Sequence, residues 1–183
     1  YVFPAGYVLD DTNQSGARDS MLLSLYQDPL PSFAGQWSRY VDAAIGNDVT
    51  GDGSILKPFK TITVALASIT DESAVKRYCI HLAAGEYIES FNMREYISLI
   101  GQGQDNTLIT GTMTFNGAAG ATGRNNFANF GIDTALVYVS AAFNNNVRFT
   151  GCRIGLLEYE GGAGYGGANV NNLFLHGCSI ANF

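Results

Sequence analysis

The sequence predicts an all-β fold, a right-handed parallel β-helix or solenoid, with a short capping helix near its N-terminal side. Residues Asn146–Ile154 align with residues Asn172–Ile180, and every second apolar position coincides. From residue 78 onward, short alternating apolar runs are separated by turn-forming residues rather than by helices. The chain holds 22 glycines and only 14% charged residues, a balance typical of turn-rich β structure. A repeat built from short strands and turns is what a solenoid requires, because each coil buries its apolar side only against its neighbours.

Composition argues against two classes of partner. The 183 residues carry 10 Lys and Arg against 16 Asp and Glu, a net charge of −6 that is unfavourable for binding phosphates, so we expect no nucleic-acid partner. No apolar run approaches the roughly 20 residues that cross a bilayer, so we expect no membrane span. The start at Tyr1 and an uncapped last coil favour a processed or truncated chain.

The chain divides at about residue 40. Residues 1–40 show no sustained period and are interpreted as an N-terminal arm or lead-in, which packs either on a neighbouring subunit or on its own domain. Residues 41–183 form the predicted β-helix. Within it, 46–54 are dense in turn formers, and Pro58 is suited to the first position of a helix. That helix would have one apolar face made by Phe59, Ile62, Leu66 and Ile69.

The predicted strands each carry a pair of inward-facing apolar residues: Ile80 and Leu82, Ile97 and Leu99, Met113 and Phe115, Val147 and Phe149, Leu173 and Leu175. Residues 127–132 fit the same template, so the offsets between coils are 22 and then 26 residues. The longer second interval contains the glycine-rich segment 161–167, where we expect an enlarged loop between coils.

Residues 40–111 resemble the N-terminal segment of the pectin-lyase-like superfamily of right-handed parallel β-helices. The matching residues are Tyr40-Val41-Asp42, Gly46-Asn47-Asp48, Gly51–Ser54, Lys57–Ile62, Ala84–Tyr87 and Leu99-Ile100-Gly101. The resemblance implies that the helix after Pro58-Phe59 caps the first coil. For function it is unspecific, because such segments are at home in phage tail fibres, virion proteins of large DNA viruses, secreted surface proteins and carbohydrate-active enzymes.

Four residues have expected structural roles at equivalent positions of successive coils. Cys152 and Cys178 should stack at the spacing of paired strands, either as a disulfide or as buried free thiols. Asn146 and Asn172, like the pair Asn125-Asn126, are interpreted as members of asparagine ladders in turns at coil corners.

No catalytic, cofactor or metal site is predicted. Asp48, Thr50 and Asp52 have calcium-loop spacing, but Phe59 stands where a bidentate Glu is required, which favours a plain turn. His81 and His176 alternate with apolar residues and should face outward. Glu158 and Glu160 could be paired carboxylates of a glycoside hydrolase or simply solvated, and Tyr159 and Tyr165 offer aromatic surface, so all four are candidate glycan-binding residues.

The leading functional prediction is a non-catalytic structural or attachment module of a virion spike, fibre or capsid-associated protein, or of a secreted surface protein. The alternatives are a polysaccharide-active enzyme, lyase or glycoside hydrolase, and a glycan-binding β-helix. Expected partners are other copies of the chain, other virion or surface proteins, and glycans; a homotrimer is an assembly that the resemblance implies. The expected location is a virion or the extracellular space.

Overall fold

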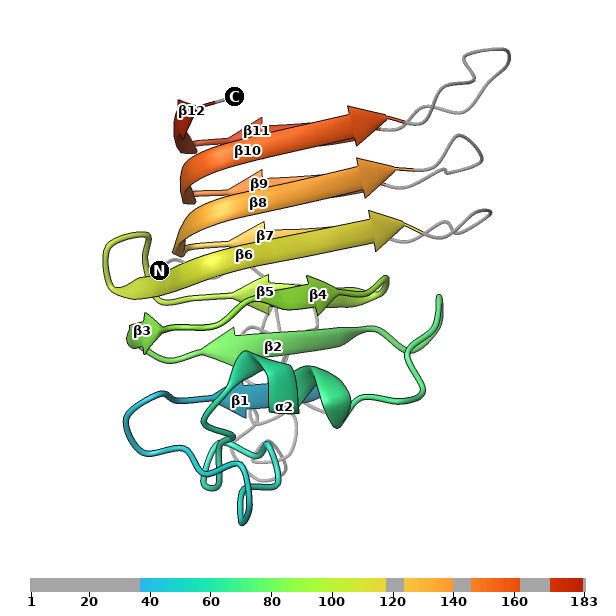
Figure 1. Ribbon diagram of the computed structural model, residues 1–183. Coiled ribbons are helices and arrows are strands. Elements are labelled where there is room, and N and C mark those ends of the chain that lie inside the picture. The colour runs from blue at the N-terminus through green and yellow to red at the C-terminus, as the bar shows by residue number, and fades with distance from the viewer. Residues whose placement is uncertain (1–36, 118–123, 140–145, 162–171, 183) are drawn as a thin grey trace, which may run out of the picture. The chain divides into compact units, whose positions relative to one another are not determined.

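The computed structural model describes residues 37–117, 124–139, 146–161 and 172–182, which form a stack of parallel β-coils (Figure 1). The strands are β1 (Ser38–Val41), β2 (Tyr78–Leu82), β3 (Gly85–Tyr87), β4 (Phe91–Met93), β5 (Ile97–Ile100), β6 (Thr107–Gly117), β7 (Arg124–Ala128), β8 (Gly131–Val139), β9 (Asn146–Thr150), β10 (Arg153–Gly161), β11 (Asn172–His176) and β12 (Ser179–Asn182). The helix α2 spans Ile62–Ala67. The fold predicted from the sequence is confirmed.

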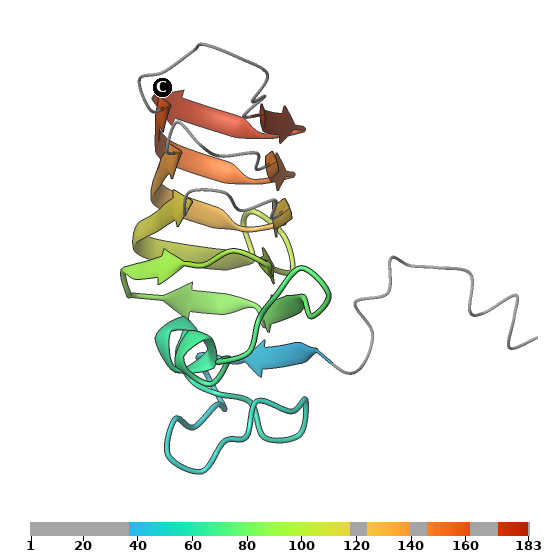
Figure 2. The same ribbon diagram turned by 90° about the vertical axis from the view of Figure 1, so that its right-hand side faces the viewer.

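Two sheets of parallel strands form the walls of the coils. The first sheet has the order β1-β2-β5-β7-β9-β11, and the second has the order β12-β10-β8-β6-β3, with β4 also paired to β6. Successive strands of each sheet lie above one another as rungs (Figure 2). From β5 onward each coil contributes one strand to each wall, whereas α2 follows β1 and both β3 and β4 follow β2. The apolar side chains between the walls form the core.

The corner from the first sheet to the second has a fixed backbone conformation in three coils. Asn129, Gly151 and Gly177 have φ values of 59°, 60° and 60°, in the left-handed region that Gly and Asn adopt most readily. Backbone hydrogen bonds join the corners along the stack, from Gly151 N to His176 O at 2.9 Å and from Arg153 N to Phe130 O at 3.0 Å. The corner thus sets the point at which β8, β10 and β12 of the second sheet begin.

Ladders of apolar side chains run through the core along the stack. Phe127 pairs in register with Phe149, with ring centroids 5.0 Å apart, and both side chains are fully buried. A second ladder joins Ile132, Ile154 and Ile180. Burying a side chain of this size contributes roughly 1.5–3 kcal/mol. These registers, and that of Asn146 with Asn172, are the ones the sequence repeat predicts.

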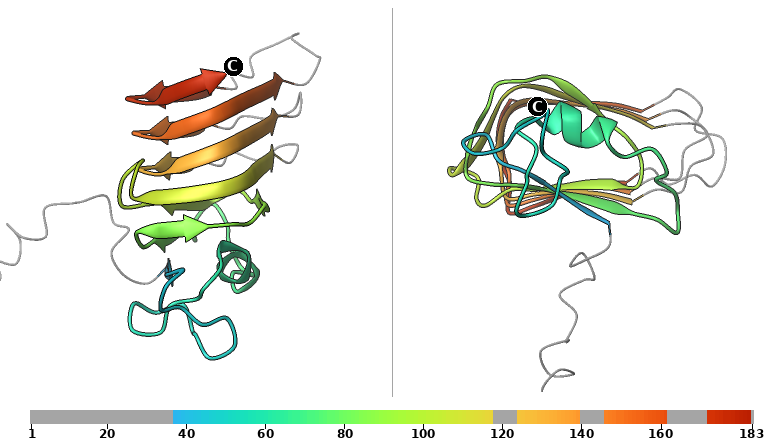
Figure 3. Two further views of the ribbon diagram at one scale, coloured as in Figure 1. Left: turned by 60° about the vertical axis from the view of Figure 1, so that its left-hand side comes forward. Right: turned by 90° about the horizontal axis from the view of Figure 1, so that it is seen from below.

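The capping helix begins later than predicted. Its N-cap is Thr61, whose side chain accepts a hydrogen bond from Val64 N, so Pro58 precedes the helix and is not its first residue. The reason is that Phe59 pairs with Val41 as an isolated bridge, which holds the segment after Pro58 extended. The predicted apolar face is nevertheless buried, and seen along the stack α2 lies within the outline of the coils (Figure 3).

Two further expectations from the sequence are the asparagine turns and the N-terminal arm. Asn125 and Asn126 lie within β7, not in a turn, and Asn125 is buried because it faces the core. Residues 1–36 lie outside the described residues, so the N-terminal arm and its boundary stay predictions. In the part of the chain that the structure describes, no helix is long and apolar enough to span a membrane.

Candidate functional site

A groove of about 240 Å³ lies on the outer surface where the strands of the second sheet begin. We call it the corner groove. It is lined by Leu108, Ile109, Thr110, Gly131, Ile132, Asp133, Arg153, Ile154, Gly155, Ser179 and Ala181. Because these residues directly follow the corners of successive coils, the groove crosses the rungs of the stack.

Two of the residues that line this groove are glycines against which neighbouring backbone packs closely. Gly131 lies between Leu108 and Arg153 in register, and a Cβ atom there would approach the backbone oxygen of Gln104 to 2.7 Å. A Cβ atom at Gly155 would lie 2.5 Å from the backbone oxygen of Asp133. Side chains are therefore excluded from both positions, because the neighbouring backbone occupies the space that they would need.

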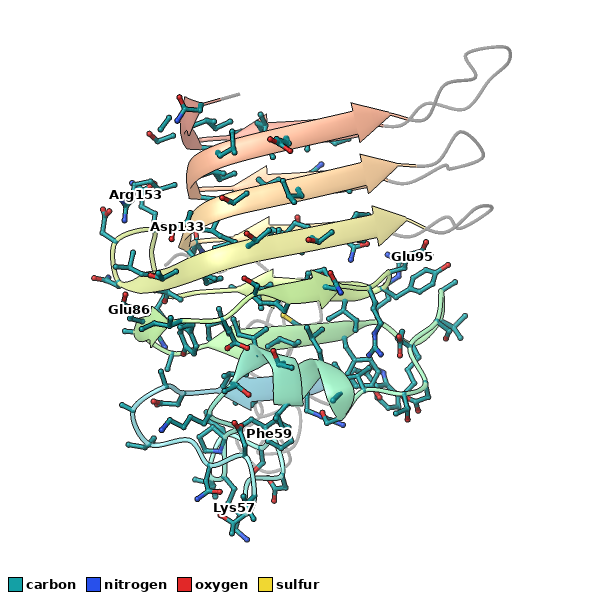
Figure 4. All side chains as sticks on the ribbon, viewed as in Figure 1. Lys57, Phe59, Glu86, Glu95, Asp133 and Arg153 are labelled. Atoms are coloured by element: carbon teal, nitrogen blue, oxygen red, sulfur yellow. The ribbon has the colours of Figure 1, made fainter. Side chains whose placement is uncertain are left out.

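Charged side chains surround the groove. Arg153 Nε lies 3.4 Å from Asp105 Oδ1, and both side chains are more than half exposed. Asp133 is exposed, and Glu86 accepts a hydrogen bond of 2.9 Å from Thr110 Oγ1. Figure 4 shows Glu86, Asp133 and Arg153 at one edge of the stack. The edge thus combines one guanidinium with several carboxylates.

This set of groups can bind and polarise an oxygen-rich ligand. The Arg153 guanidinium can donate to a carbonyl or carboxylate oxygen, since its pairing with Asp105 is loose and solvated. The Asp133 carboxylate can accept a proton from a water or a sugar hydroxyl. Among the described residues, no group of three or more His, Cys, Asp or Glu could hold a metal ion.

The sequence did not identify the corner groove. Asp133 carries no repeat signal, because the residues that succeed it along the stack are Gly155 and Ala181 in neighbouring coils. Arg153 carries no repeat signal either, because its partner in the next coil is Ser179. The available signal is positional: Asp133 lies four residues and Arg153 two residues after a corner with a left-handed backbone.

The predicted glycan-binding residues lie elsewhere. Glu158 is exposed on β10 and is in register with Leu136 of β8, farther along the second sheet than the corner groove. Tyr159 and Glu160 belong to the backbone of β10, but their side chains lie outside the described ones, as does Tyr165 altogether. Glycan binding by these residues stays a prediction.

The two histidines differ in their surroundings. His176 is exposed, as predicted. His81 also lies on the outer face of the first sheet, but its ring stacks on Tyr40 with centroids 5.0 Å apart, and Ser38 Oγ lies 3.4 Å from His81 Nε2. Burial lowers the pKa of His81, so the imidazole is neutral near pH 7.

The three cysteines are free. Cys152 is fully buried at its corner, and its thiol lies 3.5 Å from the backbone oxygens of Phe127 and Thr150, whereas Cys178 on the next coil is partly exposed. Burial raises the pKa of Cys152 to about 11 and that of Cys79 to about 12. The structure thus has thiols, and not a disulfide, at the stacked positions.

The segment with calcium-loop spacing uses its carboxylates to fix the backbone. Asp48 Oδ1 accepts hydrogen bonds from Lys60 N and Thr61 N at 2.7 and 3.0 Å. Asp52 Oδ1 accepts from Ser54 N at 2.9 Å, and hydrogen bonds from Ser54 lower the pKa of Asp52. These contacts make the segment a set of hydrogen-bonded turns that lead into α2.

Tyr87, which ends the Ala84–Tyr87 match to the superfamily, and Glu89, two residues after it, both make structural hydrogen bonds. The hydroxyl of Tyr87 donates to the backbone oxygens of Val41 at 3.2 Å and Ala83 at 3.0 Å, which joins the first two coils. Glu89 accepts hydrogen bonds from Ile62 N and Thr63 N at the start of α2. Sequence reasoning missed this role of Glu89.

Comparisons with known proteins point to one family. The family model described as Pectinesterase matches residues 47–148, which is more than half of the chain. The "Probable pectinesterase/pectinesterase inhibitor 32" of Arabidopsis thaliana is 36% identical over 77 residues, which are 40% of this chain and 13% of that protein. The chain thus spans a small part of the curated relative. No solved structure matches.

These matches correct the leading functional prediction. The expected non-catalytic structural or attachment module of a virion or surface protein is contradicted, because the matching family and the relative are named for an enzyme activity. The error arose because the resemblance was specific for the coil and its cap, features that β-helices of many functions share. The predicted alternative, a polysaccharide-active enzyme, is the one that the matches favour.

Proposed function

Since the chain belongs to the pectinesterase family, we propose that it is part of an enzyme that hydrolyses ester groups of a pectin-like polysaccharide. The family match carries this proposal, since it extends over the capping segment and the coils up to β9. A polysaccharide of this kind is an extracellular polymer, so the proposed place of action is outside the cell.

The corner groove supports the proposal through its shape and charge. It is open to solvent and crosses several coils, so that an extended polymer can lie along it without threading through the protein. A uronate polymer presents ester carbonyls and free carboxylates, both of which accept hydrogen bonds from a guanidinium. Arg153 is the cation that lines this groove.

Ester hydrolysis assigns distinct roles to the two charged residues of the groove. Water adds to the ester carbonyl as a carboxylate removes its proton, and the alcohol leaves as the carbon–oxygen bond breaks and a proton is returned to it. In the proposed reaction Asp133 accepts the proton from water, and Arg153 donates hydrogen bonds to the carbonyl oxygen as it gains negative charge; that both residues line the corner groove supports these roles.

The test is release of alcohol from a methyl-esterified pectin, followed as methanol together with base uptake at constant pH. We expect equal amounts of methanol and acid, and a decrease of about a hundredfold in kcat/KM for Arg153→Ala. Arg148→Ala is the matched control, because Arg148 is an exposed arginine of the preceding strand that lies over the Phe174 ring at 5.5 Å, away from the groove.

Three results would contradict the proposed activity, and a fourth would contradict its proposed site. Unsaturated uronate products would indicate a lyase, and new reducing ends without methanol would indicate a glycoside hydrolase. Binding of the polymer without any product would indicate a glycan-binding protein. Equal loss of activity in Arg148→Ala and Arg153→Ala would show that the corner groove is not the site of the reaction.

A further inference from the structure

A second concave site lies at the capped end of the stack, on the outer face of the first sheet. We call it the cap pocket. It has a volume of about 310 Å³, within the range of small-ligand sites, and none of its lining residues belongs to the corner groove. The ends of β1, β2 and β5 form its floor, and the loops on either side of the Asp48–Asp52 turns form its outer wall.

The walls of the cap pocket are aromatic and aliphatic. Tyr40 and His81 stack with an interplanar angle of 17°. Ile45 and Ile55 project from the loops and are 76% and 68% exposed, although both are large apolar side chains. Leaving such side chains in water is unfavourable, and a ligand with an apolar face would remove them from it.

Hydrogen bonds hold the loops in place before any ligand binds. Tyr40 N donates to Gly53 O at 2.9 Å, and Phe59 N donates to Tyr40 O at 3.0 Å. Asp42 Oδ1 accepts from Ala44 N and Ile45 N at 2.8 and 3.1 Å, which fixes the loop that carries Ile45. The pocket is therefore preformed, and binding costs little ordering of the chain.

The polar groups of the pocket define the charge of its ligand. Asp42 supplies a carboxylate, Gln102 an amide and His81 an imidazole, whereas neither lysine nor arginine is among the lining residues. An anionic ligand would face Asp42 without a compensating cation, so anions are disfavoured. A pyranose ring without a charge has an apolar C–H face for the aromatic and aliphatic walls and hydroxyl groups for the polar ones.

From these observations we infer that the cap pocket binds an uncharged sugar unit, separately from the corner groove. The inference goes beyond ester hydrolysis and does not depend on it. It gives the protein a second carbohydrate contact at the capped end of the stack.

The test is a titration of protein labelled with ¹³C at the isoleucine δ1 methyl groups, using galactotriose as the uncharged probe and trigalacturonate as the anionic one. We expect galactotriose to shift the methyl signals of Ile45, Ile55 and Ile100, which line the pocket, and to leave Ile88 unshifted, since Ile88 is exposed elsewhere. Trigalacturonate should leave the three pocket signals unshifted.

Two adjacent variants separate binding in the pocket from a general effect on the protein. Ile55→Asp should weaken galactotriose binding by about tenfold or more, and Leu56→Asp by less than about twofold, because Leu56 is 89% exposed and does not line the pocket. Absence of shifts, equal shifts with trigalacturonate, or equal weakening in the two variants would overturn the inference. The titration involves no turnover, so it is independent of the esterase assay.

Discussion

Glu89 and Arg94 bind opposite ends of the same short helix. Glu89 Oε1 accepts a hydrogen bond of 2.8 Å from Ile62 N, and Oε2 accepts one of 2.9 Å from Thr63 N. Arg94 Nη2 donates to Leu66 O at 2.8 Å and to Ile69 O at 2.6 Å. Each charge complements the helix dipole at its end and satisfies backbone groups that the six-residue helix leaves unpaired. Helix α2 depends on these contacts, since a helix this short is unstable alone.

The first prediction concerns Glu89. Replacing it in Glu89→Ala leaves the first backbone N–H groups of α2 without their acceptor, and we expect a loss of about 1–3 kcal/mol in the free energy of unfolding. Urea denaturation followed by circular dichroism measures this loss. Glu86→Ala is the control, because Glu86 is exposed and accepts from Thr110 Oγ1, so its loss should cost under about 0.5 kcal/mol. Equal losses in the two variants would contradict the capping role.

The second prediction concerns the hydroxyl of Tyr87. Tyr87→Phe keeps the buried ring and removes the donor to the backbone oxygens of Val41 and Ala83. We expect a loss of about 1–2 kcal/mol in the free energy of unfolding, because those oxygens lose a partner in a buried place. Amide hydrogen exchange should also accelerate in β1 before it does in β9. Uniform acceleration along the stack would show that the hydroxyl does not join the first two coils.

The third prediction distinguishes the thiols by their reactivity. Burial raises the pKa of Cys152 to about 11 and of Cys79 to about 12, which leaves little thiolate at pH 8, and both side chains are buried. Cys178 is partly exposed. Iodoacetamide under native conditions should therefore modify Cys178 first, as peptide mass spectrometry can show. Modification of Cys152 at the same rate would indicate that the corner opens to solvent.

The fourth prediction is a loss of stability in alkali. Cys79 and Cys152 have folded pKa values raised above the ordinary value of 9.0, so between pH 9 and 11 the unfolded chain loses thiol protons that the folded chain keeps. Stability should therefore decrease as pH rises, by up to about 1.4 kcal/mol per pH unit for each thiol. The double variant Cys79→Ala, Cys152→Ala should show a shallower decrease in urea denaturation. An unchanged pH slope in that variant would contradict the assignment to the thiols.

The core of the fold was predictable because it repeats. Phe127 and Phe149 were aligned from the sequence alone, and they are in register in β7 and β9 and fully buried, since inward positions of successive coils share one environment. The capping contacts were not predictable in the same way. Glu89 lies 27 residues after Ile62 in the sequence, and neither the residue types nor their spacing indicates that the two are joined by a hydrogen bond.

The candidate sites were harder to predict than the core. Outward residues change from coil to coil. The positions equivalent to Asp133 in the next two coils hold Gly155 and Ala181, so no acidic residue repeats there in the sequence. The cap pocket joins Tyr40 of β1 to Ile100 of β5, which are far apart in the sequence. Their proximity follows from strand register and loop paths, which the sequence does not indicate directly. The aromatic and carboxylate residues that sequence reasoning did choose lie in or beside the glycine-rich segment, where repetition fails.

The coils that contain a left-handed corner have a constant backbone conformation at that edge and a variable number of residues at the opposite edge. At Asn129, Gly151 and Gly177 the turn has the same backbone conformation, while the interval between residues in register changes from 22 residues, Phe127 to Phe149, to 26, Phe149 to Leu175. The difference is absorbed between the end of β10 and the start of β11. Insertions and deletions during evolution can therefore accumulate at that edge without displacing the opposite one. Recombination of whole coils, cut at these corners, should accordingly yield folded chimaeras of differing coil length.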